Sequence, residues 1–82
     1  MGFVELETYR WTDNRVKIQD FYDQLPQVIK NLIIDLEKAD EVEDWGYFNL
    51  CDSIENVAKL YVPEGKITKE QFNKLCLRYN GG

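Results

Sequence analysis

The sequence predicts an α+β domain that is mainly helical, with a β-hairpin over residues 4–19 followed by three packed helices over residues 24–39, 47–61 and 69–79. Apolar and polar residues alternate at the start of the chain, and in three later stretches apolar residues recur every three or four positions. At 82 residues the chain has the length of one small domain. The alternative is an all-α small bundle in which residues 13–25 are helical as well.

The predicted hairpin depends on alternation on both sides of a turn. Val4 and Leu6 lie on one side of the first strand, and Val16 and Ile18 lie on one side of the second. Between them the run Thr-Asp-Asn, residues 12–14, is typical of a turn. Since successive side chains of a strand point to opposite faces, we expect two antiparallel strands here.

The first predicted helix begins close to Pro26. A heptad-like apolar spacing that one long helix would satisfy runs through Ile18, Tyr22, Leu25, Ile29, Leu32 and Leu36. Inside such a helix Pro26 would remove a backbone hydrogen bond and clash with the carbonyl of Tyr22, which costs about 3 kcal/mol or more. We therefore expect a break, with Asp23 or Leu25 as the N-cap and Pro26 in the first turn. The predicted buried face consists of Ile29, Leu32, Ile33 and Leu36.

Two further helices are predicted on either side of a turn at Pro63, which ends the first of them. One face of each helix is apolar: Leu50, Ile54, Val57 and Tyr61 in residues 47–61, and Phe72, Leu75, Cys76 and Tyr79 in residues 69–79. Thr68 with Gln71 three residues later predicts a capping box at the start of the last helix. Ile67 and Phe72 predict a hydrophobic staple at the same place.

The segment VPEGKITKEQF, residues 62–72, has the glycine spacing of an EF-hand calcium loop without its ligands. With Gly65 at the sixth loop position, the first position is Leu60 and the twelfth is Gln71, where a bidentate carboxylate is needed. The one acidic side chain left is Glu64, whereas calcium takes roughly six to eight oxygen ligands. We expect no calcium here and read the segment as a helix start.

The residue types present exclude several classes of site. The chain has no histidine, which removes the usual proton shuttle at neutral pH and the Ser-His and Cys-His nucleophile pairs. Its two cysteines, Cys51 and Cys76, are too few for a disulfide scaffold or a four-thiolate zinc site, and we expect both to be buried on helices. We therefore predict no enzyme, no cofactor and no metal.

Two further features concern the location of the protein. The longest aliphatic run, Leu32-Ile33-Ile34, is far shorter than the ~20 apolar residues of a membrane span. The first residues are acidic where a signal peptide is basic. We expect a cytoplasmic protein that has no membrane partner.

Acidic residues are concentrated in the middle of the chain. The formal net charge is −5, but residues 35–55 hold eight acidic residues and one lysine. A negative patch repels phosphate backbones and attracts basic surfaces. Trp45 directly follows the acidic run, and an aromatic ring among carboxylates is typical of a protein-binding surface. The predicted partner-binding residues are Asp40, Glu41, Glu43, Asp44 and Trp45. In the alternative, Trp45 packs with Tyr47 and Phe48 under the loop to complete a small core.

These features predict a small acidic, non-enzymatic protein-binding module that engages a basic protein, as inhibitors, immunity proteins and antitoxins do. The alternative is a small nucleic-acid-binding regulator in which the last two helices form a helix-turn-helix pair. Polar residues suited to that role lie off the apolar face of the last helix: Lys69, Asn73, Lys74 and Arg78. The acidity of the chain makes nucleic acid the less favoured partner.

Overall fold

A computed structural model describes residues 11–79 of the chain. These residues form three α-helices, α1 (Gln27–Glu41), α2 (Tyr47–Tyr61) and α3 (Lys69–Arg78), preceded by a short 3-10 helix, η1 (Tyr22–Gln24). No strand occurs between residues 11 and 79, so the predicted α+β class is wrong and the all-α alternative fits.

The predicted β-hairpin over residues 4–19 is the main error. Its first part, residues 4–10, lies outside the described residues, and residues 11–19 form bends, turns and irregular backbone. Their backbone groups bond to the helices instead of to a neighbouring strand: the Thr12 N–H donates to the Asp40 carboxylate (2.9 Å), and the Asp13 N–H donates to the Arg78 carbonyl (2.9 Å). Residues 13–25, which the all-α alternative expects to be helical, are helical only in η1.

Helix α1 begins directly after Pro26, which is itself the N-cap, and not at residue 24 as predicted. With ψ at 149°, Pro26 is extended, and its carbonyl accepts the first backbone hydrogen bonds of the helix. The helix also ends at residue 41, two positions after the predicted end. Ile29, Ile33 and Leu36 are fully buried along its inner face.

Helix α2 covers the predicted range 47–61, and α3 ends one residue before the predicted position 79. The predicted capping box at the start of α3 is confirmed. The Thr68 side chain accepts the Gln71 N–H at 3.0 Å, and the Gln71 side chain accepts the Thr68 N–H at 3.0 Å. Two of the four unpaired N–H groups of the first turn region are thus satisfied locally.

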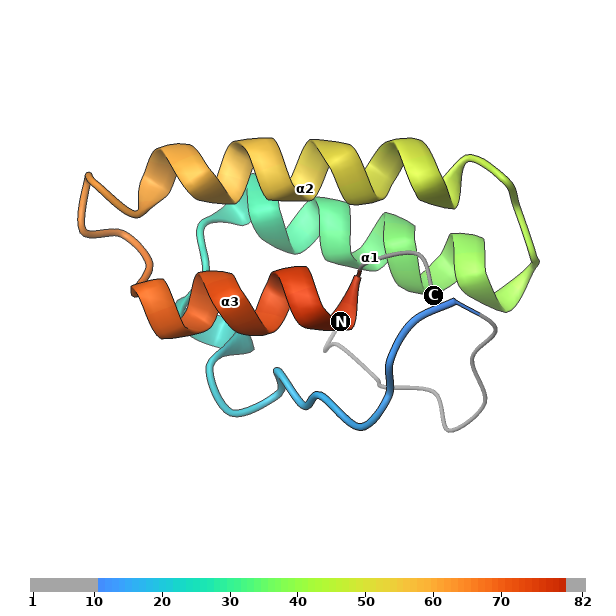
Figure 1. Cartoon of the computed structure of the whole chain (residues 1–82), viewed down its shortest axis with the longest axis horizontal. Helices are drawn as coiled ribbons and strands as arrows, with labels where there is room; N and C mark the ends of the chain where they lie inside the picture. Colours follow the sequence, from blue (N-terminus) through green and yellow to red (C-terminus); the bar gives the residue numbers. More distant parts are fainter. Residues whose placement is uncertain (1–10, 80–82) are drawn as a thin grey trace.

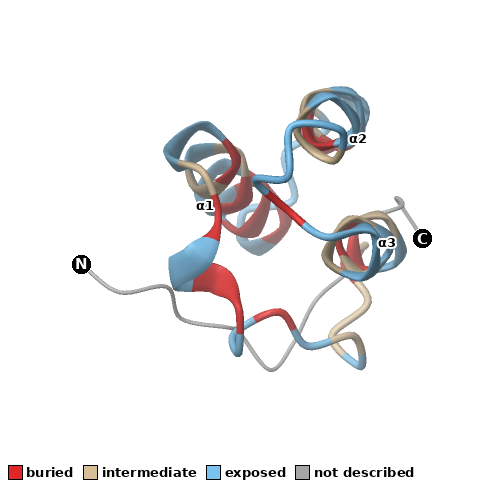
Figure 2. Ribbon diagram, turned by 90° about the vertical axis from the view of Figure 1, so that its left-hand side faces the viewer, coloured by how far each residue is buried: buried red, intermediate tan, exposed pale blue. Residues whose placement is uncertain are grey.

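The three helices lie side by side with their axes nearly parallel or antiparallel, as Figures 1 and 2 show from two directions. α2 packs against both α1 and α3. Residues 11–25 run along the open side between α1 and α3 and contribute Ile18, Phe21, Tyr22 and Leu25 to the core (Figure 2). The irregular segment therefore takes the place of a fourth element of the bundle.

Candidate functional site

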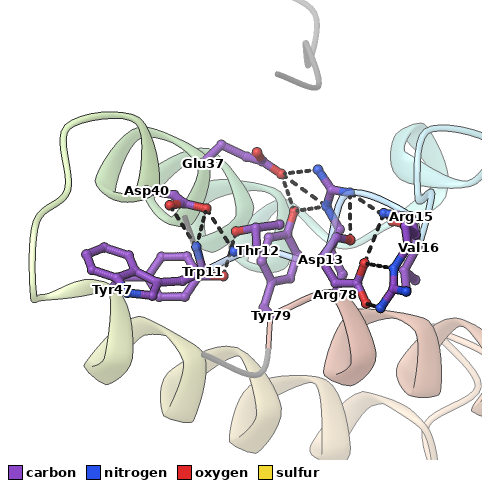
Figure 3. A network of polar contacts seen from close by, with 10 residues as sticks. All are labelled: Trp11, Thr12, Asp13, Arg15, Val16, Glu37, Asp40, Tyr47, Arg78 and Tyr79. Carbon is purple, nitrogen blue, oxygen red and sulfur yellow. Dashed lines mark hydrogen bonds and ion pairs between the residues drawn. The ribbon is translucent and has the colours of Figure 1, made fainter. Parts of the chain in front are cut away.

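The acidic residues predicted to bind a partner fall into two groups. Asp40, in the last turn of α1, is buried, with 3% of its surface exposed. Its carboxylate oxygens accept the N–H groups of Trp11 (3.2 Å) and Thr12 (2.9 Å), as Figure 3 shows. Asp40 therefore holds the N-terminal segment against α1, and its charge does not face solvent.

The other four predicted residues are exposed and adjacent at the connection between α1 and α2. Glu41 ends α1, Glu43 and Asp44 lie in the loop, and Trp45 stands shortly before α2. The Asp44 Oδ1 accepts the Gly46 N–H (2.8 Å), so this side chain also shapes the turn into α2. Three carboxylates and one indole thus share one end of the bundle.

The loop leaves α1 through a Schellman motif, in which an extra turn satisfies the last helical carbonyls. The Asp44 N–H donates to the Ala39 carbonyl (2.8 Å) and the Glu43 N–H donates to the Asp40 carbonyl (3.2 Å). Glu43 occupies the left-handed position with φ at 57°, where glycine is the usual residue. An acidic side chain thus stands where the backbone favours glycine, and strain of this kind is found at functional positions.

Trp45 belongs to a cluster of four aromatic rings. Its ring centroid lies 5.6 Å from that of Trp11 and 5.7 Å from that of Phe48, and Trp11 lies 5.4 Å from Tyr47. Tyr47 is fully buried and Trp11 and Phe48 are partly buried, whereas Trp45 exposes 72% of its surface. The alternative in which Trp45 packs under the loop to complete the core therefore does not describe Trp45, whereas its neighbour Tyr47 does belong to the core.

Val42 adds an aliphatic side chain to this end of the molecule, with 61% of its surface exposed. We refer to the exposed residues together with the two rings beneath them as the aromatic–acidic surface: Trp11, Glu41, Val42, Glu43, Asp44, Trp45 and Phe48. The sequence did not indicate that Trp11 belongs to this surface, because its position predicted a β-strand. Trp11 and Trp45 are 34 positions apart in the sequence, so no local pattern indicates their contact.

A second polar network ties residues 13 and 16 to the bundle. The Arg78 guanidinium is fully buried and donates to the Glu37 Oε1 (3.0 Å) and to the Val16 carbonyl (2.8 Å), as Figure 3 shows. The Tyr79 hydroxyl donates to the same Glu37 oxygen (2.6 Å). Burial alone would lower the pKa of Arg78, but Tyr79 and Glu37 outweigh it and the pKa is raised. Arg78 stays charged.

Burial of Arg78 bears on the nucleic-acid alternative. That alternative placed Arg78 on the outer face of the last helix, where it could reach a phosphate, but its surface is fully buried. Helices α2 and α3 also run alongside one another (Figure 1), whereas a helix-turn-helix pair crosses at roughly 90–120°. Neither feature favours a recognition helix in α3.

Both cysteines are free thiols and line one pocket between α2 and α3, of about 260 Å³, together with Asp52, Ile54, Glu55 and Tyr79. Cys51 is buried and Cys76 is partly exposed. Burial raises the pKa of Cys51 to about 11 and raises the pKa of Cys76 as well. Both thiols are therefore protonated near neutral pH, which disfavours nucleophilic chemistry.

Between residues 11 and 79, His, Cys, Asp and Glu side chains do not gather in groups of three that could hold a metal ion. None of the helices in this range has the length and apolar character required to cross a bilayer.

Comparison of the chain with protein-family models, with curated proteins and with solved structures finds no match in any of the three.

Proposed function

We propose that the protein is a non-enzymatic binding module whose aromatic–acidic surface engages a basic surface on another protein. The observation that carries the proposal is the 72% exposure of Trp45, a side chain that folded domains usually bury to a large extent. Tryptophan is also the residue type most enriched among those that dominate binding energy at protein interfaces. Here the Trp45 ring packs against the rings of Trp11 and Phe48, and its exposed surface is available to a partner.

The charges around Trp45 favour a basic partner. Glu41, Glu43 and Asp44 are exposed, and the chain carries a formal net charge of −5. Carboxylates around an apolar anchor raise the association rate with a positive surface and disfavour a negative one. An arginine of the partner fits this chemistry well, because its guanidinium stacks on an indole while its N–H groups reach neighbouring carboxylates.

The left-handed backbone at Glu43 supports the same proposal. A glycine there would relieve the conformational cost that this glutamate carries. Binding accounts for that: the Glu43 carboxylate stands two residues from Trp45, on the same loop.

The test compares proteins retained from a lysate of the source cells on the full chain and on two variants, at physiological salt. Trp45→Ala removes the anchor, and a triple variant with Glu41, Glu43 and Asp44 each changed to Lys reverses the charge. A matched control places lysine at three other exposed acids, Asp20, Asp23 and Glu64. We expect one basic protein to be retained by the wild type and the control, with loss of about 30-fold or more in affinity for Trp45→Ala.

Two results would contradict this proposal. One is retention of the same protein at equal affinity by the wild type and both test variants. The other is nucleic acid as the retained species, bound more tightly by the charge-reversed variant and released steeply as salt rises.

A further inference from the structure

We propose that Asp40 is a positioning residue for the aromatic–acidic surface, which it shapes by holding the Trp11 ring under Trp45. This inference rests on the proposed function, because it assigns Asp40 a part in the same binding surface. Asp40 itself is buried, so it acts on that surface through the main chain of the N-terminal segment.

Both oxygens of the Asp40 carboxylate are used on consecutive N–H groups. The Trp11 N–H donates to Oδ1 (3.2 Å) and the Thr12 N–H donates to Oδ2 (2.9 Å), so the carboxylate clamps two neighbouring peptide units (Figure 3). Hydrogen bonds from main-chain N–H groups to an ionised carboxylate are among the stronger ones in proteins. They connect residues that are 28 and 29 positions apart, so this contact fixes where the segment lies on α1.

A second bond fixes the same peptide to α2. The Thr12 hydroxyl and the Tyr47 hydroxyl share a hydrogen bond of 2.6 Å, and both side chains are buried. Residue 12 is thus attached to two helices at once, and the Trp11 N–H beside it lies within bonding distance of both Asp40 oxygens, at 3.2 and 3.4 Å. The Asp40 carboxylate therefore holds the peptide units of residues 11 and 12, and with them the main chain that carries the Trp11 ring.

The Trp11 ring is the centre of the aromatic cluster. Its centroid lies 5.1 Å from Phe48, 5.4 Å from Tyr47 and 5.6 Å from Trp45. Trp45 exposes most of its surface, and within residues 11–79 the rings of Trp11 and Phe48 are the aromatic groups that lie against its indole. A displaced Trp11 would remove one of these two supports and let Trp45 take other rotamers, which lowers affinity because the ring must then be ordered on binding.

The experiment uses Asp40→Asn in the full chain. An asparagine offers one acceptor oxygen and one NH₂ group where the aspartate offers two acceptor oxygens, so the Trp11 and Thr12 N–H groups, which bond to both oxygens, lose part of this contact. The readout is the circular dichroism signal that arises from coupling between two neighbouring indoles; its loss in Trp45→Phe assigns it to the pair Trp11–Trp45. Asp35→Asn, which removes an exposed charge from the same helix, is the matched control.

A second control separates positioning from general loss of stability. Thr68→Ala removes the capping box of α3 and destabilises the domain without touching the aromatic cluster. We expect the indole signal to fall in Asp40→Asn and to stay at the wild-type level in Thr68→Ala and Asp35→Asn. If Asp40→Asn does not fold, Asp40→Glu provides the same test, since it keeps the charge but moves the acceptor oxygens by one methylene.

A wild-type signal in the folded Asp40 variant would overturn the inference. Titration with an oligoarginine peptide then separates the two proposals. Weaker peptide binding by Asp40→Asn than by Asp35→Asn, together with the lower signal, supports positioning. A lower signal with unchanged peptide affinity overturns it, because the surface would then not depend on Trp11. No binding of the peptide by the wild type would contradict the proposed function while the signal still reports on the rings.

Discussion

Arg78, the last residue of α3, donates to the Glu37 Oε1 of α1 at 3.0 Å, and both side chains are buried. The same guanidinium donates to the Val16 carbonyl, and the Arg78 carbonyl accepts the Asp13 N–H. One residue thus connects α1, α3 and the irregular segment that lies between them. The pair joins elements whose direct packing is less extensive than that of α2 with either neighbour.

The first prediction concerns this buried ion pair. Arg78→Met leaves the Glu37 carboxylate without its cation and leaves the Val16 carbonyl without its side-chain donor, so the free energy of unfolding should fall by about 3–5 kcal/mol. That is a large part of the stability of a domain of this size, roughly 5–15 kcal/mol. Urea unfolding followed by circular dichroism measures the change.

Removal of both charges provides the control. In the double variant Glu37→Leu with Arg78→Met no ion is left unpaired, so much of the lost stability should return. A double variant that is no more stable than Arg78→Met alone would show that the cost does not come from the unpaired carboxylate. Arg15→Ala serves as the reference for an exposed pair, since Arg15 and Asp13 form their salt bridge at the surface, and its effect should be much smaller.

The second prediction exchanges glycine between two left-handed positions. Glu43 has φ at 57° and Gly65 has φ at 74°, and a Cβ added at Gly65 would meet no atom within 4 Å. Glu43→Gly should therefore raise the free energy of unfolding by about 0.5–1 kcal/mol, and Gly65→Ala should lower it by a similar amount. Thermal unfolding of both variants tests the pair.

The same Glu43→Gly variant should bind the partner more weakly, because it removes one of the carboxylates around Trp45. Higher stability combined with lower affinity is the expected signature of a residue kept for binding at a strained position. A variant that is more stable and binds as well as the wild type would remove Glu43 from the proposed surface.

The sequence predicts those elements whose signals are local. The range of α2 follows from its apolar spacing, and the start of α3 follows from Thr68 and Gln71, which lie within one turn. Pro26 indicated correctly that the heptad-like pattern is interrupted, but not that Pro26 itself would be the N-cap. Caps and apolar periodicity depend on residues that lie a few positions apart, so a single sequence is enough to predict them.

The segment of residues 11–25 could not be predicted, because contacts with distant residues determine its path. Val16 and Ile18 alternate as they would in a strand, yet the backbone around them is bonded to Asp40 and Arg78. Nothing in the local sequence pairs Thr12 with Asp40 or Glu37 with Arg78. The same holds for the proposed binding surface. The acids of the loop stand out in the sequence by their charge, but the burial of Asp40 and the contact of Trp11 with Trp45 depend on tertiary structure.

The third prediction concerns alkaline pH. Burial raises the pKa of Tyr47, and burial together with Glu37 raises the pKa of Tyr79 well above its ordinary value of 10.0. In the unfolded chain these phenols lose their protons near pH ~10, before the folded protein does. The unfolded state then binds fewer protons, so the stability that the two phenols contribute is complete below pH ~10 and is lost as pH rises above it.

The free energy of unfolding, measured by urea unfolding between about pH 8 and pH 11, should therefore fall steeply in the upper part of this range, by up to about 1.4 kcal/mol per pH unit for each phenol. Tyr47→Phe removes one of the two groups and should give a shallower fall. Equal slopes for the wild type and Tyr47→Phe would show that Tyr47 ionises alike in the folded and unfolded chain.

The fourth prediction concerns the two thiols that share the pocket between α2 and α3. Burial raises the pKa of Cys51 to about 11 from 9.0, so at pH ~8 its thiolate is about a hundredfold scarcer than that of a free cysteine. Cys76 is partly exposed, and its pKa is raised by burial and by Glu55. In the native protein Cys76 should therefore react first with a colorimetric disulfide reagent. Cys51 should react mainly when the protein unfolds. In urea both thiols should react fast. Cys51→Ala and Cys76→Ala assign the two phases, and equal rates of both thiols in the native protein would contradict this difference in burial.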